Sequence, residues 1–272
     1  MSHLDSGNDR YVYYESYGSG SSALVLIHGW GMSCRTWDYV VPALVSTGYR
    51  VVLIDHRGCG RSSMDFDDMS IPGIAGDVVD LVDHLGLEKV VLNGWSLGGA
   101  VAVEAADRLG GRCNGLVLTT GATPVYVQKP DFPHGGTAED MANTLAALAA
   151  DRVGFLHGLA QAVCAKPVGE HVENWLWSIF LQSSPVAGST LGELAELDQR
   201  EQLKSLPVPV LSFVGSEDAI VAPPTCRWVG DHHPEAKVVE FEGVGHAPFI
   251  EVPEAYLEAL QTFLQEKLIT RG

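Results

Sequence analysis

Residues Gly94-Trp95-Ser96-Leu97-Gly98-Gly99 carry the strongest structural signal of the sequence, because they place a serine among glycines where a strand is expected to turn into a helix. They follow the aliphatic run 90–92 and open a helix-like segment at 97–109. So sharp a turn strains the backbone at the serine, and only glycine two positions away on each side avoids a collision. The serine hydroxyl is then held out beyond the end of the strand. The motif therefore predicts a reactive serine at the edge of a sheet.

Aliphatic runs of strand length alternate with helix-like segments along most of the chain. The runs are continuous rather than alternately polar and apolar, which is typical of strands buried on both faces. They lie at residues 24–27, 51–54, 90–92, 116–119, 208–214 and 237–241, and the helix-like segments at 73–85, 97–109 and 253–268. The alternation predicts an α/β fold with a mostly parallel central sheet flanked by helices. In such sheets the chemistry collects past the carboxyl ends of the strands.

Residues 124–205 break this alternation, because they contain no aliphatic strand run and favour helices. We predict that residues 1–123 and 206–272 form the core and that 124–205 form an inserted helical cap. The cap has five basic and ten acidic residues, a net charge of −5. Its aromatic side chains, Trp175 among them, either pack inside the cap or line a substrate pocket.

The composition excludes several classes of function. The 272 residues are 46% hydrophobic and have a net charge of −17, which is typical of a globular protein whose surface repels nucleic acid and anionic membranes. No apolar run approaches the roughly 20 residues of a membrane span, and residues 1–7 do not resemble a signal peptide. The five scattered cysteines form no CxxC pair, so we expect a reducing, cytoplasmic location without disulfides or a zinc site. No metal or organic cofactor is expected.

A serine becomes a nucleophile only with a base and an orienting acid. His246 follows the run 237–241, and Asp218 follows the run 208–214, so both are expected at the same sheet edge as Ser96. His246 would remove the serine proton, and Asp218 would orient and stabilise the imidazole. Glu217 is the rival acid, but one position along the chain it should point away from the site.

The segment His28-Gly29-Trp30-Gly31 follows the run 24–27. Its glycine-rich turn can present the backbone N–H of Trp30 inward, where with the N–H of Leu97 it would form an oxyanion hole. His28 is interpreted as a residue that fixes this turn. Residues 55–62 follow the next run and are interpreted as scaffold, because they match neither a phosphate-binding nor a dinucleotide-binding motif.

On these motifs the sequence resembles the α/β-hydrolases over the whole chain outside the cap. The segment 28–31, the serine motif and His246-Ala247-Pro248-Phe249-Ile250 resemble the pimeloyl-carrier-protein methyl ester esterase of biotin synthesis, acyl-homoserine lactonases and other small esterases. The resemblance implies a triad of Ser96, Asp218 and His246, with Trp30 and Leu97 as oxyanion donors. A serine in place of an aspartate disfavours haloalkane dehalogenase and epoxide hydrolase chemistry.

We therefore expect a serine hydrolase that cleaves a small, largely apolar ester or lactone through an acyl-enzyme. The expected substrate contacts are Trp30, Trp95, Trp175 and Phe249. The acidic cap would repel an acidic carrier protein, so a free small molecule is the expected partner. The alternatives are a cofactor-free perhydrolase or haloperoxidase, a carbon–carbon bond hydrolase, and a hydrolase-fold ligand receptor. The sequence leaves the oligomeric state open.

Overall fold

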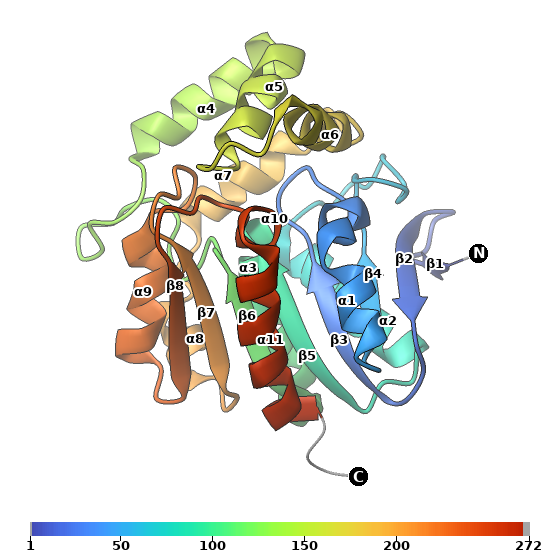
Figure 1. The fold of residues 1–272 in the computed structure, drawn as a ribbon. Coiled ribbons are helices and arrows are strands. Elements are labelled where there is room, and N and C mark those ends of the chain that lie inside the picture. The colour runs from blue at the N-terminus through green and yellow to red at the C-terminus, as the bar shows by residue number, and fades with distance from the viewer. Residues whose placement is uncertain (1, 269–272) are drawn as a thin grey trace.

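The sheet seen at the centre of Figure 1 organises the molecule. A computed structural model describes residues 2–268, and within them eight strands form one sheet in the order β1-β2-β4-β3-β5-β6-β7-β8. Strands β3 to β8 are mutually parallel, and β1 and β2 are antiparallel additions at one edge. The strands are β1 (His3–Asp5), β2 (Tyr11–Tyr17), β3 (Ser22–Ile27), β4 (Arg50–Ile54), β5 (Lys89–Trp95), β6 (Cys113–Thr119), β7 (Val210–Gly215) and β8 (Ala236–Phe241).

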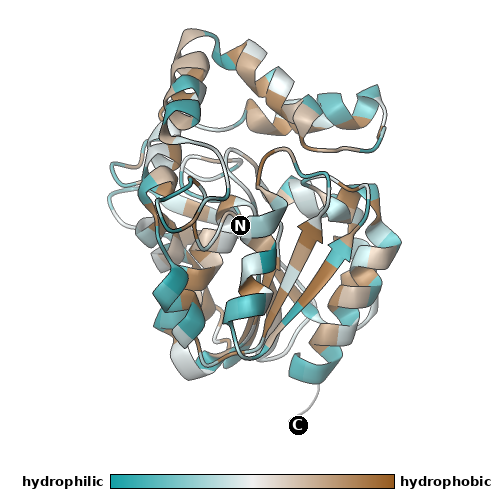
Figure 2. Ribbon diagram, turned by 90° about the vertical axis from the view of Figure 1, so that its left-hand side faces the viewer, coloured by the Kyte–Doolittle hydropathy of each residue, from teal (hydrophilic) through white to brown (hydrophobic). Residues whose placement is uncertain are grey.

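The six parallel strands confirm the aliphatic runs of the sequence. The apolar side chains of β3 to β7 are buried because helices cover both faces of the sheet, whereas β8, at the sheet edge, is only partly buried. The strands are mainly brown in the hydropathy colouring of Figure 2. Strands β1 and β2 were not predicted from the sequence. They are edge strands, and β2 (Tyr-Val-Tyr-Tyr-Glu-Ser-Tyr) mixes polar and aromatic residues with most side chains partly or fully exposed.

Helices cover both faces of the sheet. α1 and α11 contact each other, and α11 packs against β5 and β6 (Figure 1). α2 and α3 form a second pair of packed helices. Ser70 caps α2 by accepting a hydrogen bond from the Gly73 N–H. These core helices are α1 (Val41–Ser46), α2 (Ile71–His84), α3 (Leu97–Leu109), α9 (Pro223–His232), α10 (Pro248–Glu251) and α11 (Pro253–Leu268), with short 3₁₀ turns at Cys34–Tyr39 and Gly110–Arg112.

The segment between β6 and β7 forms the cap. It contains α4 (Ala138–Ala150), α5 (Arg152–Ala162), α6 (Glu170–Phe180), α7 (Gly188–Glu196) and α8 (Arg200–Ser205). Helices α4 to α7 lie above the carboxyl ends of the strands in Figure 1, while α8 lies against α3. The space between these helices and the strand ends is therefore where a substrate could be enclosed. No described helix is long and apolar enough to cross a membrane.

Candidate active site

Ser96 lies at the turn between β5 and α3, in a conformation that few residues other than glycine adopt. Its φ is 57° and its ψ is −124°. A Cβ added to Gly94 would lie 2.6 Å from the backbone N of Gly99, and one added to Gly98 would lie 2.6 Å from the carbonyl oxygen of His28. Both distances are too short for real atoms, so the two glycines allow the close packing that this turn requires. The strained turn that the sequence predicts is present.

His246 and Asp218 are joined by a hydrogen bond of 2.7 Å between Nδ1 and Oδ2, and both side chains are buried. The other oxygen of Asp218, Oδ1, accepts the backbone N–H groups of Ile220 and Val221 at 2.8 and 2.9 Å. These bonds fix the carboxylate as an acceptor for the imidazole. With the Nδ1 proton directed at Asp218, the Nε2 atom of a neutral imidazole is free to accept a proton. The rival acid Glu217 is exposed.

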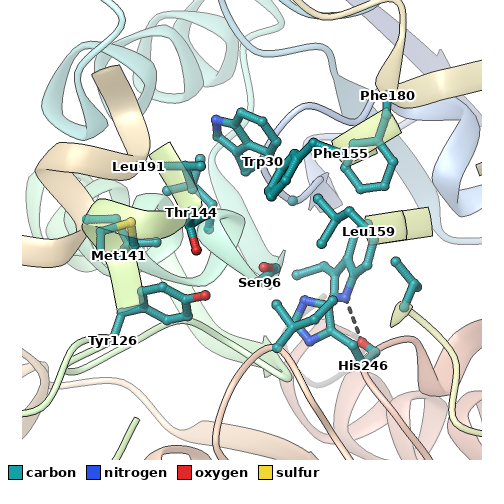
Figure 3. A pocket seen from close by; sticks show the side chains of 16 residues that line it. Trp30, Ser96, Tyr126, Met141, Thr144, Phe155, Leu159, Phe180, Leu191 and His246 are labelled. Carbon is teal, nitrogen blue, oxygen red and sulfur yellow. Dashed lines mark hydrogen bonds between the residues drawn. The ribbon is translucent and has the colours of Figure 1, made fainter. Parts of the chain in front are cut away.

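The main chain of His246 is also held from several directions. Its carbonyl oxygen accepts hydrogen bonds from Trp95 Nε1 at 2.8 Å and Thr120 Oγ1 at 2.7 Å, and its N–H donates to Val163 O in the cap at 2.9 Å. The first of these bonds is the dashed line in Figure 3. The position of the imidazole therefore depends on both the core and the cap.

Glu251 stabilises the same loop and was not singled out in the sequence. Its Oε1 atom accepts the N–H of Gly245 at 2.9 Å, and its Oε2 atom accepts the N–H groups of Ala165 and Lys166 at 3.0 and 2.8 Å. One carboxylate therefore ties the loop before His246 to the cap. Glu251 stands five positions after the histidine in sequence, but only the folded chain places it against residues of the cap.

Ser96 and His246 line the same cavity between the sheet and the cap (Figure 3). Its volume is about 80 Å³. A water occupies about 10–15 Å³ on this measure, so the cavity has room for roughly five to eight water-sized groups. The complete lining is Gly29, Trp30, Trp95, Ser96, Leu97, Tyr126, Met141, Thr144, Phe155, Leu159, Val163, Phe180, Leu191, Leu194, Ile220 and His246. It contains no lysine, arginine, aspartate or glutamate.

The backbone N–H groups of Trp30 and Leu97 flank Ser96 and are not used in the hydrogen bonds of the described chain. A Cβ on Gly29 would lie 3.1 Å from the Cβ of Ser96, so the turn before Trp30 rests against the serine. Leu97 is the first residue of α3, where unpaired N–H groups favour negative charge.

Comparisons with known proteins identify the family to which this fold belongs. The model of the family described as "alpha/beta hydrolase fold" matches residues 22–253. The chain belongs to this family. The pimeloyl-[acyl-carrier protein] methyl ester esterase of Sodalis glossinidius is 32% identical over 264 residues, which cover 93% of this chain and 98% of the relative. An α/β-hydrolase superfamily protein of Bacillus subtilis, YisY, is 27% identical and covers 89% of this chain and 91% of the relative.

Two solved structures are similar over nearly their whole length. An esterase from Exiguobacterium antarcticum has a TM-score of 0.93 at 24% identity, covering 97% of this chain and 99% of that chain, and supports the fold. A bromoperoxidase from Bacillus anthracis has a TM-score of 0.89 at 28% identity, covering 94% and 96%. The family and these relatives make the protein an esterase-type hydrolase.

Two residues expected to contact substrate lie outside the cavity lining of this hydrolase, and the expectation for them is corrected. Trp175 lies on the flank of α6, with its ring centroid 5.6 Å from that of Tyr39. The buried stripe of α6 is formed by other positions, which end in Phe180, and Phe180 is the aromatic residue of this helix that reaches the cavity. Phe249 is fully buried and packs its ring against Trp95 at 5.2 Å, so it supports the cavity wall from behind.

Several lining residues were not identified from the sequence. Tyr126 precedes α4, Met141 and Thr144 lie on α4, and Phe155 and Leu159 lie on α5. No motif marks them, because the cap helices face both the cavity and solvent and their sequence periodicity does not indicate which face is which. Hydrophobic patterning alone could not select them.

The scaffold role expected for His28 and residues 55–62 is confirmed. His28 Nδ1 lies 2.7 Å from Gly29 O, and His28 Nε2 accepts the N–H of His56 at 2.9 Å. Asp55 Oδ2 accepts the N–H of Arg61 at 2.8 Å, and its Oδ1 accepts the N–H of Cys34. Burial lowers the pKa of both His28 and His56, which stack at 3.7 Å between centroids. The neighbouring loops on which the site rests are thereby fixed.

Proposed function

We propose that this protein is a serine hydrolase that cleaves a small, largely apolar carboxylic ester or lactone through an acyl-enzyme. The observation that carries the proposal is that Ser96 and His246 line one cavity while Asp218 holds the imidazole at 2.7 Å. The strained turn at Ser96 presents its hydroxyl to that cavity. The unpaired N–H groups of Trp30 and Leu97 supply donors for a developing negative charge.

The reaction follows from these positions. His246 Nε2 removes the proton of Ser96 Oγ as the oxygen attacks the substrate carbonyl. The backbone N–H groups of Trp30 and Leu97 stabilise the tetrahedral oxyanion, and Asp218 stabilises the imidazolium. His246 then donates the proton to the leaving alcohol. In the second half, His246 removes a proton from water as the water oxygen attacks the acyl-enzyme carbonyl. The bond between the acyl group and Ser96 Oγ then breaks, His246 returns the proton to Ser96, and the carboxylic acid is released.

The lining of the cavity favours a neutral substrate. It is mainly aliphatic and aromatic, and its only nitrogen-bearing ionisable side chain is His246. A carboxylate in this cavity would lose its hydration without gaining a cation, which is costly. This disfavours the dienoate anions of carbon–carbon bond hydrolases. The acidic cap also disfavours an acidic carrier protein, despite the names of the relatives, and favours a free small molecule.

We place the enzyme in the reducing cytoplasm. All five cysteines are free thiols, and four of them are buried. Burial raises the pKa of Cys59 to about 12 and of Cys113 to about 11, so these thiols stay protonated and unreactive near neutral pH.

A second candidate is a cofactor-free perhydrolase, in which hydrogen peroxide instead of water attacks the acyl-enzyme. The observation that favours this candidate is the similarity to the bromoperoxidase from Bacillus anthracis, at 28% identity. Both reactions use the same acyl-enzyme, so they differ only in the second nucleophile. Formation of peracetic acid from acetate and hydrogen peroxide, at a rate above that of ester hydrolysis, would support the second candidate.

Steady-state hydrolysis of p-nitrophenyl esters from acetate to dodecanoate tests the proposal. The small cavity predicts an optimum at a short acyl chain, with turnover that disappears in Ser96→Ala. No turnover above the Ser96→Ala background on any ester would contradict it. A single burst without turnover would indicate a ligand receptor instead.

A further inference from the structure

The two sides of the cavity differ in chemistry. In Figure 3 the rings of Trp30, Phe155 and Phe180 and the side chain of Leu159 form one side, whereas Tyr126 carries its hydroxyl toward Ser96 from the other. Thr144 carries a second hydroxyl in the lining of the same cavity. A few polar groups in an otherwise apolar pocket usually fix the orientation of a ligand.

Within residues 2–268 the Tyr126 hydroxyl forms no hydrogen bond, although it faces a mainly apolar cavity. Asp218 is close enough to influence it, but the oxygens of Asp218 already accept bonds from His246, Ile220 and Val221. A phenol in such a place has the capacity to donate a hydrogen bond to a bound molecule.

The proton of the Thr144 hydroxyl is already used in a hydrogen bond within the protein. It donates a hydrogen bond of 2.9 Å to the backbone oxygen of Asp140, one turn earlier in α4, so only its acceptor capacity remains. Of the two hydroxyls, Tyr126 is therefore the one whose proton is available to a ligand.

From this arrangement we propose that Tyr126 is a specificity-determining residue whose hydroxyl donates a hydrogen bond to a second oxygen of the substrate, separate from the scissile ester. The substrates would then be neutral esters or lactones that carry an ether, keto or hydroxyl oxygen near the reacting carbonyl. This inference rests on the proposed hydrolase function of Ser96 and adds the substrate class.

The electrostatic environment keeps Tyr126 a donor. Burial and the negative charge of Asp218 raise its pKa to about 12, so the hydroxyl stays protonated throughout the pH range in which a histidine base operates. The same environment would oppose a negatively charged oxygen beside it. The preferred acceptor is therefore a neutral oxygen.

Matched pairs of p-nitrophenyl esters test the role of Tyr126. Methoxyacetate and butanoate have the same number of chain atoms, and so do 3-methoxypropanoate and pentanoate, but one member of each pair replaces a methylene with an oxygen. The kcat/KM of each ester is measured for the wild type, Tyr126→Phe and the control Tyr39→Phe, which removes an exposed hydroxyl outside the lining. Dividing the variant by the wild type cancels the differing intrinsic reactivity of the esters.

Tyr126→Phe should lower kcat/KM for at least one methoxy ester by about three- to tenfold, the range expected for one neutral hydrogen bond. The alkyl partners should stay within about twofold, and Tyr39→Phe should change neither. An equal loss on both members of every pair would make Tyr126 merely structural and overturn the inference. If the kcat/KM of Tyr126→Phe divided by that of the wild type stays near one for both methoxy esters, the inference is overturned as well. The proposed function is judged separately by alkyl-ester turnover of the wild type against Ser96→Ala, and without that turnover the inference falls with it.

Discussion

At the scale of single residues, the geometry of the site depends on the hydrogen bonds that fix each side chain. Asp218 accepts two backbone N–H groups with one oxygen and the imidazole with the other, so its orientation leaves one arrangement for His246. The hydrogen bond to Asp218 keeps a proton on Nδ1 of His246. Nε2 is then unprotonated in the neutral ring and can act as a base, so the residue at position 218 must be a hydrogen-bond acceptor. Glu217, one position earlier, is exposed and contributes nothing to this arrangement.

Asp218→Asn should therefore lower kcat by about 10⁴-fold, as happens when a triad aspartate loses its charge and the histidine adopts the wrong tautomer. Esterase assays of Asp218→Asn and of the control Glu217→Gln measure this, and the control should remain near the wild-type rate. A near-normal rate for Asp218→Asn together with a loss in Glu217→Gln would assign the role to Glu217.

The positions of Ser96, Asp218 and His246 could be predicted because each follows an aliphatic run that forms a parallel strand. Parallel strands bring their carboxyl ends to one edge, so sequence order alone places the three residues together. Trp175 could not be placed in this way. Whether it faces the cavity depends on the rotation of α6 within the cap, and no backbone rule fixes that rotation from the sequence. Tyr126 could not be placed either, because it lies in the irregular segment between β6 and α4, where no periodic pattern indicates which side chains face the cavity.

At the scale of elements, the turn between β5 and α3 illustrates how small residues permit function. Gly94 and Gly98 allow the strand, the helix and the neighbouring loop to approach more closely than any side chain would permit. Not every glycine of the fold has such a role. Gly158, inside α5, has nothing within 4 Å of the position that a Cβ would take.

Substitution by alanine should have opposite effects on the stability of the protein at Gly94 and at Gly158. Gly94→Ala should destabilise the protein by about 3 kcal/mol or more, because the new methyl group collides with backbone atoms that cannot move freely. Gly158→Ala should stabilise it by about 0.5–1 kcal/mol, since alanine favours helix and orders the unfolded chain. Urea unfolding measures both. Equal effects of the two substitutions would refute this account of the turn.

The elements also show where sequence patterns fail. The five buried strands β3 to β7 were visible as aliphatic runs, and the partly exposed edge strand β8 was visible through its run 237–241. The edge strand β2 was missed because it has no such run. Its Val12 is buried while its tyrosines are partly exposed or exposed, which leaves no aliphatic run to recognise. Likewise, α5 has two buried residues and presents others to the cavity, so it carries little amphipathic signal.

At the scale of the whole molecule, buried histidines link stability to pH. His28 accepts the N–H of His56 through Nε2, and His56 Nε2 is buried without a partner within the described chain. Protonation of either ring would place a charge in the core, which explains why burial lowers both pKa values. The unfolded chain binds these protons near pH 6.5, and the folded chain does not. Stability contributed by the neutral pair is therefore present above pH 6.5 and is lost as the pH falls below it.

The free energy of unfolding should fall between pH 6.5 and 5 by up to about 1.4 kcal/mol per pH unit for each of these histidines. His56→Phe retains a ring beside His28 but removes one titrating group, so its slope should be about 1 kcal/mol per pH unit smaller. His171→Phe, at an exposed position of α6, should keep the wild-type slope. Urea unfolding at several pH values gives these slopes. An identical slope in His56→Phe and the wild type would exclude His56 as a source of the acid sensitivity.

Covalent labelling tests whether Ser96 is the nucleophile of a serine hydrolase. The wild type, Ser96→Ala and the control Ser216→Ala are treated with a fluorophosphonate, and the intact masses and labelled peptides are determined. Ser216 also follows a strand but lies outside the cavity lining. The account predicts one adduct, on the peptide that contains Ser96, in the wild type and Ser216→Ala and none in Ser96→Ala. An unlabelled wild type, or labelling that persists in Ser96→Ala, would contradict it.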